Sequence, residues 1–139
     1  MRIFLYGTLL DPRILALRSG RRGLERGAVP AILLGWRRVA LRGGPYPTLI
    51  RGRGAPVPGL LLVLRGAAFR RLTAYEGAAY RLRPLRPLTR RGRRAAAAWI
   101  AAPALADAAR PWHSSAARGI VNPRCFNRWL AESQLSRAW

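Results

Sequence analysis

The apolar run from Val57 to Leu64, VPGLLLVL, is the stretch that most constrains how this 139-residue chain can fold. Because nearly all of its side chains are apolar, it predicts a strand that is buried on both faces. A second apolar run, Arg2–Tyr6, predicts a buried first strand. Further strands are predicted within residues 28–41, at 46–50, and in a hairpin of residues 80–88 and 94–101.

Helices are predicted at two places between these strands. Asp11 is a suitable N-cap and Pro12 a suitable first residue for a short helix. Residues 66–75 carry apolar and aromatic side chains at three-residue spacing, and Gly77 follows as a C-terminal cap. Residues 103–115 are expected to be irregular, and a final helix is predicted after Asn122-Pro123. This order of elements predicts an α+β fold, a mixed, closed or strongly curved β-barrel flanked by helices.

Length and composition indicate one globular domain over residues 1–139. Half of the residues are hydrophobic, which favours a folded core. No apolar run approaches the roughly 18 residues that a membrane span needs, and the N-terminal run that stops at Asp11 lacks a signal-peptide cleavage site. The single cysteine, Cys125, excludes an internal disulfide and is compatible with a reducing cytosol. We therefore expect a cytoplasmic protein without a membrane partner.

The charge balance is strongly basic. All 26 basic residues are arginine, only five residues are acidic, and the net charge is +21. Arginine-rich surfaces neutralise phosphates, so a nucleic-acid-binding protein is one alternative. The absence of lysine, together with abundant Ala, Gly and Pro, is also what a GC-rich coding sequence produces, and the arginines are spread along the chain. We expect weak, salt-sensitive binding of polyanions rather than a specific nucleic-acid partner.

Several kinds of catalytic site are excluded by the residues available. His113 and Cys125 cannot form a metal site without carboxylates, and the carboxylates are scattered. There is no P-loop, no GxGxxG and no GxSxG motif. Four of the five tryptophans are interpreted as core or interface residues. We expect neither a metal nor a cofactor.

The segment Tyr6-Gly7-Thr8-Leu9 joins the first strand to the first helix. Its consecutive backbone N–H groups have no ladder partners, so they can converge on an anion such as a carboxylate. The alternative is a plain strand-to-helix turn that needs Gly7 for its backbone angles.

Glu76 is a rare acid at the end of the second predicted helix, where the macrodipole disfavours negative charge. Tyr75 and Tyr80 are placed to shield it from water. Both effects would raise its pKa from about 4.3 toward the range of about 6–7 that suits a general base. Three arginines would lower that pKa if their head groups lie close: Arg70, Arg71 and Arg81. The sequence leaves this balance open, and a surface turn residue is the alternative interpretation.

Four motifs occur together in the order and spacing of a known family: YGTLL at 6–10, YPTLI at 46–50, VPGLLLVL at 57–64 and LTAYEGAAYRL at 72–82. Over roughly residues 2–101 the chain resembles the γ-glutamylcyclotransferase-like (AIG2-like) family. Residues after Ala102 match nothing specific.

The resemblance implies a mixed β-barrel flanked by helices, with the YGTL loop and Glu76 lining one cavity. Members of the family release 5-oxoproline from γ-glutamyl amines, because the substrate's α-amine attacks its own γ-carbonyl and expels the attached amine. By analogy, the backbone N–H groups of residues 7–9 would hold the substrate's α-carboxylate. Glu76 would carry a proton from the α-ammonium to the leaving amine, and Tyr6 and Tyr80 would shape the cavity.

Three hypotheses follow from the sequence. The first is a cyclotransferase-type enzyme acting on a small γ-glutamyl amine or peptide. The second is a non-catalytic module that binds small acids on the same fold. The third is the arginine-rich nucleic-acid-binding protein.

Overall fold

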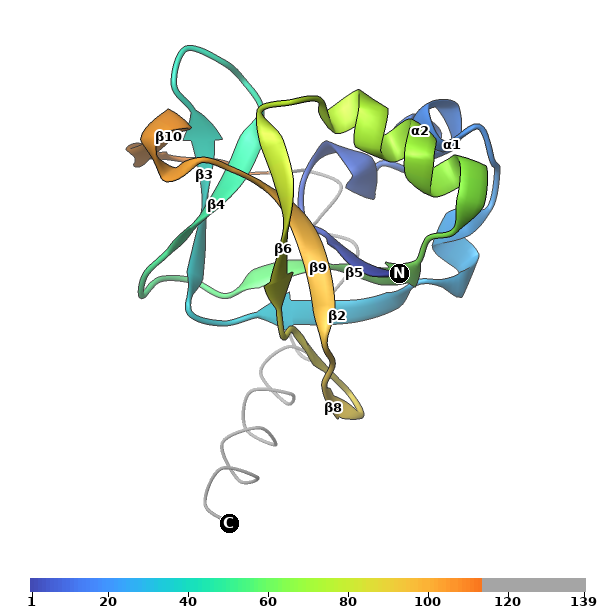
Figure 1. Ribbon diagram of the computed structural model, residues 1–139. Helices are drawn as coiled ribbons and strands as arrows, with labels where there is room; N and C mark the ends of the chain where they lie inside the picture. The colour runs from blue at the N-terminus through green and yellow to red at the C-terminus, as the bar shows by residue number, and fades with distance from the viewer. Residues whose placement is uncertain (114–139) are drawn as a thin grey trace.

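The computed structural model describes residues 1–113, and its main feature is a strongly curled mixed sheet that forms a half-barrel (Figure 1). Its seven strands lie in the order β6-β9-β1-β5-β2-β7-β8. Their bounds are β1 Arg2–Leu5, β2 Val29–Leu33, β5 Val57–Val63, β6 Tyr80–Leu85, β7 Leu88–Thr89, β8 Gly92–Arg93 and β9 Ala96–Ala101. Strands β1 and β9 are parallel, and every other neighbouring pair is antiparallel. The predicted α+β fold with a strongly curved sheet is confirmed.

A second sheet of three strands lies beside the first, in the order β10-β3-β4. Its strands are β3 Trp36–Leu41, β4 Pro47–Arg51 and β10 Ala106–Pro111. The prediction that residues 103–115 are irregular is wrong over β10, which pairs with β3. The sequence of β10, ADAARP, has no apolar alternation. The strand is held by its ladder and by arginine side chains of β3 and the following turn, as in the 2.9 Å bond from Arg37 Nη2 to the carbonyl of Ala108.

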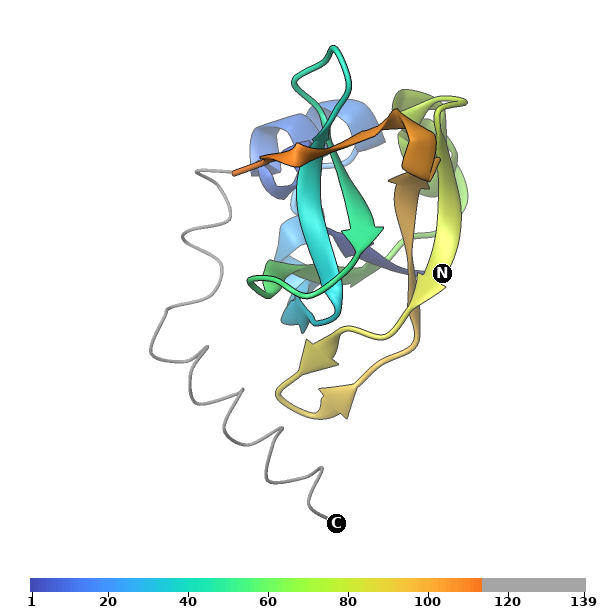
Figure 2. The same ribbon diagram turned by 90° about the vertical axis from the view of Figure 1, so that its left-hand side faces the viewer.

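Two α-helices cover one face of the larger sheet, α1 Pro12–Ser19 and α2 Gly66–Glu76 (Figures 1 and 2). The predicted cap of α1 is confirmed, because Asp11 accepts a 2.9 Å hydrogen bond from the backbone N–H of Arg13. Short 3-10 helices lie at η1 Thr8–Leu10, η2 Leu24–Gly27 and η3 Pro103–Leu105. Among the described residues, neither α-helix has the length and apolar character needed to cross a membrane. The predicted helix after Asn122-Pro123 lies outside these residues.

Strand β5 is the centre of the core, as its apolar sequence predicts. It pairs with β1 on one side and β2 on the other. Leu62 faces the helices and packs in a cluster with Ile3, Leu72 and Trp99. Leu61 faces the opposite, concave side and packs in a second cluster with Phe4. Both leucines are only 4% exposed, so the strand is buried on both faces at its middle.

Candidate active site

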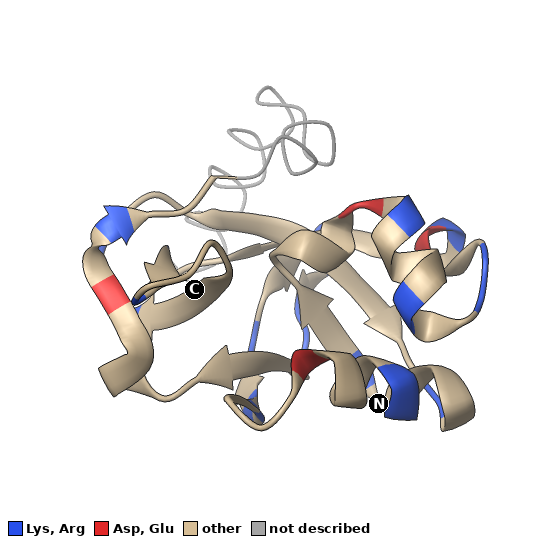
Figure 3. Ribbon diagram, turned by 90° about the horizontal axis from the view of Figure 1, so that it is seen from above, with Lys and Arg blue, Asp and Glu red and all other residues tan. Residues whose placement is uncertain are grey.

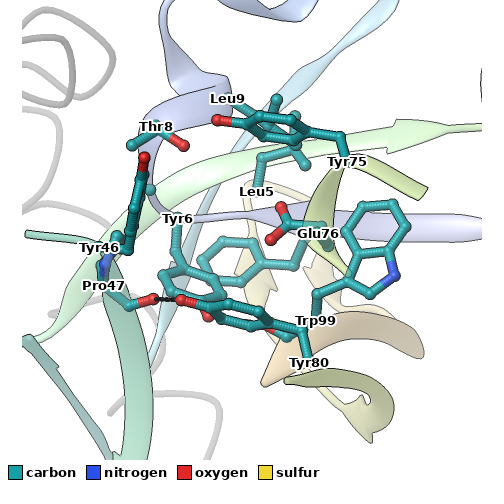
Figure 4. A pocket seen from close by; sticks show the side chains of 12 residues that line it. Leu5, Tyr6, Thr8, Leu9, Tyr46, Pro47, Tyr75, Glu76, Tyr80 and Trp99 are labelled. Atoms are coloured by element: carbon teal, nitrogen blue, oxygen red, sulfur yellow. Dashed lines mark hydrogen bonds between the residues drawn. The ribbon is translucent and has the colours of Figure 1, made fainter. Parts of the chain in front are cut away.

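A cavity of about 240 Å³ lies where the end of β1, the end of α2 and the start of β4 meet. Figure 4 shows the carboxylate of Glu76 pointing into it, between Tyr75 on one wall and Tyr6 and Tyr80 on the other. The lining residues are Phe4, Leu5, Tyr6, Gly7, Thr8, Leu9, Tyr46, Pro47, Tyr75, Glu76, Tyr80 and Trp99. All six site residues predicted from the sequence therefore line one cavity.

Glu76 is the last residue of α2, and Gly77 ends the helix with a φ of 76°, a conformation that favours glycine. The side chain is half-buried. Burial raises the pKa of Glu76 from its ordinary value of 4.5 to about 7. No described residue forms an ion pair with this carboxylate. Burial, rather than nearby arginine charge, thus determines the pKa of Glu76. Glu76 is also the only charged side chain among the described residues that line the cavity.

The phenol groups of Tyr6 and Tyr80 are committed to backbone carbonyls. Tyr6 donates to the carbonyl of Trp99 at 2.5 Å, and Tyr80 donates to the carbonyl of Pro47 at 2.7 Å. Burial raises the pKa of both phenols, and the nearby Glu76 carboxylate raises each of them further. Both tyrosines therefore stay protonated at neutral pH and act as fixed walls, and neither donates its hydroxyl proton to the carboxylate of Glu76.

The turn after β1 forms the wall opposite Glu76. Its 3-10 helix begins at Thr8, and the backbone N–H of Leu10 bonds back to the carbonyl of Gly7 at 3.0 Å. The first backbone N–H groups of any helix have no acceptor within the helix. Gly7, Thr8 and Leu9 line the cavity at the start of this short helix.

Gly7 is required for a steric reason. Its φ is −128° and its ψ is −135°. A Cβ atom on Gly7 would lie 2.6 Å from Cγ of Pro47, well inside contact distance. Gly7→Ala therefore has to push Pro47 away, and with it the carbonyl that accepts the bond from Tyr80.

We expect Gly7→Ala to lower the free energy of unfolding by about 1–2 kcal/mol, as overpacked sites generally do. Thermal and urea unfolding measure this loss. The matched control is Pro47→Ala, which removes the clashing atom. In a double-mutant cycle the two substitutions should couple, so that the double variant is more stable than the sum of the single losses. Strictly additive losses of unfolding free energy in the two single variants would contradict a clash between Gly7 and Pro47.

The half-buried Arg38 binds the backbone of the turn after β1. Nη1 of Arg38 donates to the carbonyl of Tyr6 at 2.8 Å, and Nε donates to the carbonyl of Trp112 at 3.1 Å. Burial lowers the pKa of Arg38. Trp112 in turn donates from Nε1 to the carbonyl of Pro45 at 2.6 Å. Arg38 and Trp112, the residue after β10, thereby link the turn after β1 to the loop that carries Tyr46 into the cavity.

Sequence reasoning did not assign Tyr46, Pro47 or Trp99 to the site. Trp99 is a packing residue, as the sequence predicts: it is 4% exposed and stacks on Phe69 with ring centroids 6.1 Å apart. Tyr46 and Pro47 belong to the YPTLI motif, and that motif was the available signal. Their approach to Glu76 depends on how the two sheets pack.

The arrangement is suited to proton transfer next to a bound anion. One carboxyl group with a pKa near neutrality shares a small cavity with the turn of residues 7–9. Among residues 1–113, no group of His, Cys, Asp or Glu side chains is gathered to hold a metal ion. The chemistry that the side chains themselves support is acid/base chemistry.

Comparison with known proteins gives one family and several similar folds. The model of a protein family described as gamma-glutamyl cyclotransferase, AIG2-like, matches residues 3–116. The solved structure of YkqA from Bacillus subtilis has a TM-score of 0.69 and 17% identity, covering 95% of this chain and 53% of that one. A protein of Arabidopsis thaliana, solved in solution, has a TM-score of 0.62 and 20% identity, covering 97% and 83%.

A structure named gamma-glutamyl cyclotransferase has a TM-score of 0.58 and 16% identity, covering 73% of this chain and 66% of that one. At such identities these structures show a likeness of fold alone. A search of curated protein sequences found no match.

Proposed function

The chain belongs to the gamma-glutamyl cyclotransferase, AIG2-like family, and we propose that it is an enzyme releasing 5-oxoproline from a small γ-glutamyl amine or peptide. The observation that carries the proposal is the Glu76 carboxyl group, which has a pKa of about 7 and shares a cavity with the amides of residues 7–9. A carboxyl group that exchanges its proton near neutral pH suits a reaction that needs a base and then an acid.

In this proposal the turn after β1 positions the substrate. The backbone N–H groups of Gly7, Thr8 and Leu9 bind the α-carboxylate of the glutamyl group, since oriented amides at a helix start favour anions. This contact places the α-ammonium near Glu76. The walls of Tyr6 and Tyr80 limit how the glutamyl chain can fold, so the chain is held bent toward its own γ-carbonyl.

Glu76 then moves one proton. Its carboxylate takes a proton from the α-ammonium, and the freed amine nitrogen attacks the γ-carbonyl carbon to close a five-membered ring. The bond from that carbon to the leaving nitrogen breaks, and protonated Glu76 returns the proton to the leaving amine. Ring closure leaves one further proton on the ring nitrogen, and the released amine takes it up. The products are therefore 5-oxoproline and the amine as its ammonium ion, and Glu76 is again a carboxylate.

Two effects account for the rate. Ring closure is intramolecular, and well-oriented intramolecular reactions reach effective molarities of about 10⁵ M or more. A positioned acid/base adds a factor of about 10² to 10⁴. The nucleophile belongs to the substrate, so a cavity with one carboxyl group among its described lining residues is sufficient.

The test is a panel of γ-glutamyl amines and γ-glutamyl dipeptides incubated with the full-length protein, with 5-oxoproline and the free amine quantified together. We expect at least one compound to yield both products in equal amounts. Thermal stabilisation by small acids without product from any member of the panel would instead identify a non-catalytic binding module.

A further inference from the structure

The concave face of the half-barrel has a second opening, at the end far from Glu76. Strand register shows which residues reach it. Arg2 pairs with Val63, and Val29 pairs with Leu61. Paired residues of antiparallel strands share a face, and so do residues two apart on a strand. Arg2, Val29 and Val63 therefore lie on the same face as Leu61 and Phe4, which belong to the concave-side core cluster.

The concave-side core cluster does not include the residues at this end of the sheet. Val29 is 48% exposed and Val63 is 50% exposed, whereas Leu61 is 4% exposed. Val29, Leu61 and Val63 line a groove of about 540 Å³, which is more than twice the volume of the cavity at Glu76. Two half-exposed valines beside a buried leucine form an apolar floor that the described part of the chain leaves uncovered.

Arginines surround this floor. The β7–β8 hairpin extends beyond the ends of β6 and β9 (Figure 1), and Arg90 and Arg91 form its turn. Strand β7 pairs with β2 at Leu88 and Ile32, which brings the hairpin across the open end. Arg90, Arg91 and Arg94 line the groove from this side, and Arg2 lines it from β1.

None of the described residues that line the groove is acidic. Acidic positions are few across the whole fold (Figure 3). The charge of the groove is therefore positive, and its ligand should be an anion. Arginine binds phosphate and carboxylate groups through paired N–H donors.

We propose that this groove binds a monomeric amphiphilic anion, a single alkyl or acyl chain that ends in a phosphate or carboxylate group. The arginines of the hairpin hold the anionic head, and Val29, Leu61 and Val63 hold the chain. This ligand class matches both properties of the groove. A nucleic-acid strand would match the arginines alone, because none of the lining residues within 1–113 is an aromatic that could stack on a base.

The test is calorimetric titration of the full-length protein with decyl phosphate, below the concentration at which it forms micelles, against butyl phosphate and inorganic phosphate. Each methylene group moved from water into an apolar site strengthens binding up to about fourfold. We expect decyl phosphate to bind at least tenfold more tightly than butyl phosphate.

Two matched double variants distinguish binding in the groove from nonspecific attraction to the protein's overall positive charge. Arg91→Ala with Arg94→Ala should weaken decyl phosphate binding at least tenfold. Arg22→Ala with Arg53→Ala removes the same charge from exposed positions outside the groove and should weaken it less than twofold. Equal weakening by the two pairs would overturn the proposal.

A third variant tests the floor. Val29→Thr with Val63→Thr keeps the shape and strand preference of both side chains, and it should remove the advantage of the long chain while leaving butyl phosphate binding unchanged. The proposal would also be overturned by equal affinity for the two chain lengths in the unmodified protein. Binding of anionic vesicles or oligonucleotides without binding of monomeric decyl phosphate would overturn it as well.

Discussion

Replacing Glu76 by Gln is expected to lower 5-oxoproline release by about 10²- to 10⁴-fold, the contribution of a positioned acid/base. Gln keeps the shape of the side chain but can neither accept the α-ammonium proton nor return it. The amides of residues 7–9 and the tyrosine walls remain, so substrate should still bind. The loss should therefore appear in kcat, measured by product release on a substrate that the unmodified protein accepts.

The same substitution should stabilise the fold at high pH. Burial holds the pKa of Glu76 at about 7, above its ordinary value of 4.5, so the folded protein favours the protonated carboxyl group. The stability of the native protein accordingly falls as pH rises from about 4.5 through about 7. At pH 8 Glu76→Gln should gain about 1–2 kcal/mol, once partial exposure of the side chain is allowed for. At pH 4 there should be no such gain.

Glu25→Gln is the matched control for the activity measurement. Glu25 lies in the 3-10 helix η2 and does not line the cavity, so its replacement should leave product release unchanged. An inactive Glu76→Gln variant that is also less stable at pH 8 would indicate damage to the fold. Full activity of Glu76→Gln would exclude the proposed role of this residue.

Gly59→Ala should have the largest effect on stability, a loss of about 3 kcal/mol, at the upper end of what overpacking generally costs. Gly59 lies in β5, beside the end of β1. A Cβ atom there would lie 2.2 Å from the carbonyl oxygen of Leu5 and 2.6 Å from the ring of Phe4. The backbone of β1 cannot move away without losing its pairing with β5.

Urea unfolding measures this loss, and Gly44→Ala is the control, because a Cβ atom at Gly44 would meet nothing within 4 Å. The control should change stability by less than about 0.5 kcal/mol. The turn that follows β1 lines the cavity, so Gly59→Ala should also weaken binding there. Equal stability of the two variants would show that β1 does not pass as close to Gly59 as described.

The strands and helices that carry an apolar pattern were predictable from the sequence. The Val57–Leu64 run predicted β5, and the 66–75 spacing with Gly77 predicted α2 almost to its last residue. Strand β10 was missed because ADAARP carries no pattern of burial. Its pairing with β3 depends on backbone groups and on arginines elsewhere in the chain.

The cavity was predictable in part. The motifs placed the Tyr6–Leu9 turn, Glu76 and Tyr80 together, and they do line one cavity. Their roles stay a prediction. Tyr46 and Trp99 come from positions far apart in the chain, and only the packing of the two sheets and α2 brings them there. The pKa of Glu76 depends on where arginine head groups lie relative to a half-buried carboxylate, which spacing along a chain does not determine.

The central claim is that the Glu76 carboxyl group performs the chemistry with a pKa near neutrality. The pH dependence of kcat/KM for 5-oxoproline release tests it most directly. Because the base must be ionised, kcat/KM should rise about tenfold per pH unit below pH 7 and level off above it. A profile that stays flat between pH 5.5 and pH 8, or one that is the same in Glu76→Gln, would contradict the claim.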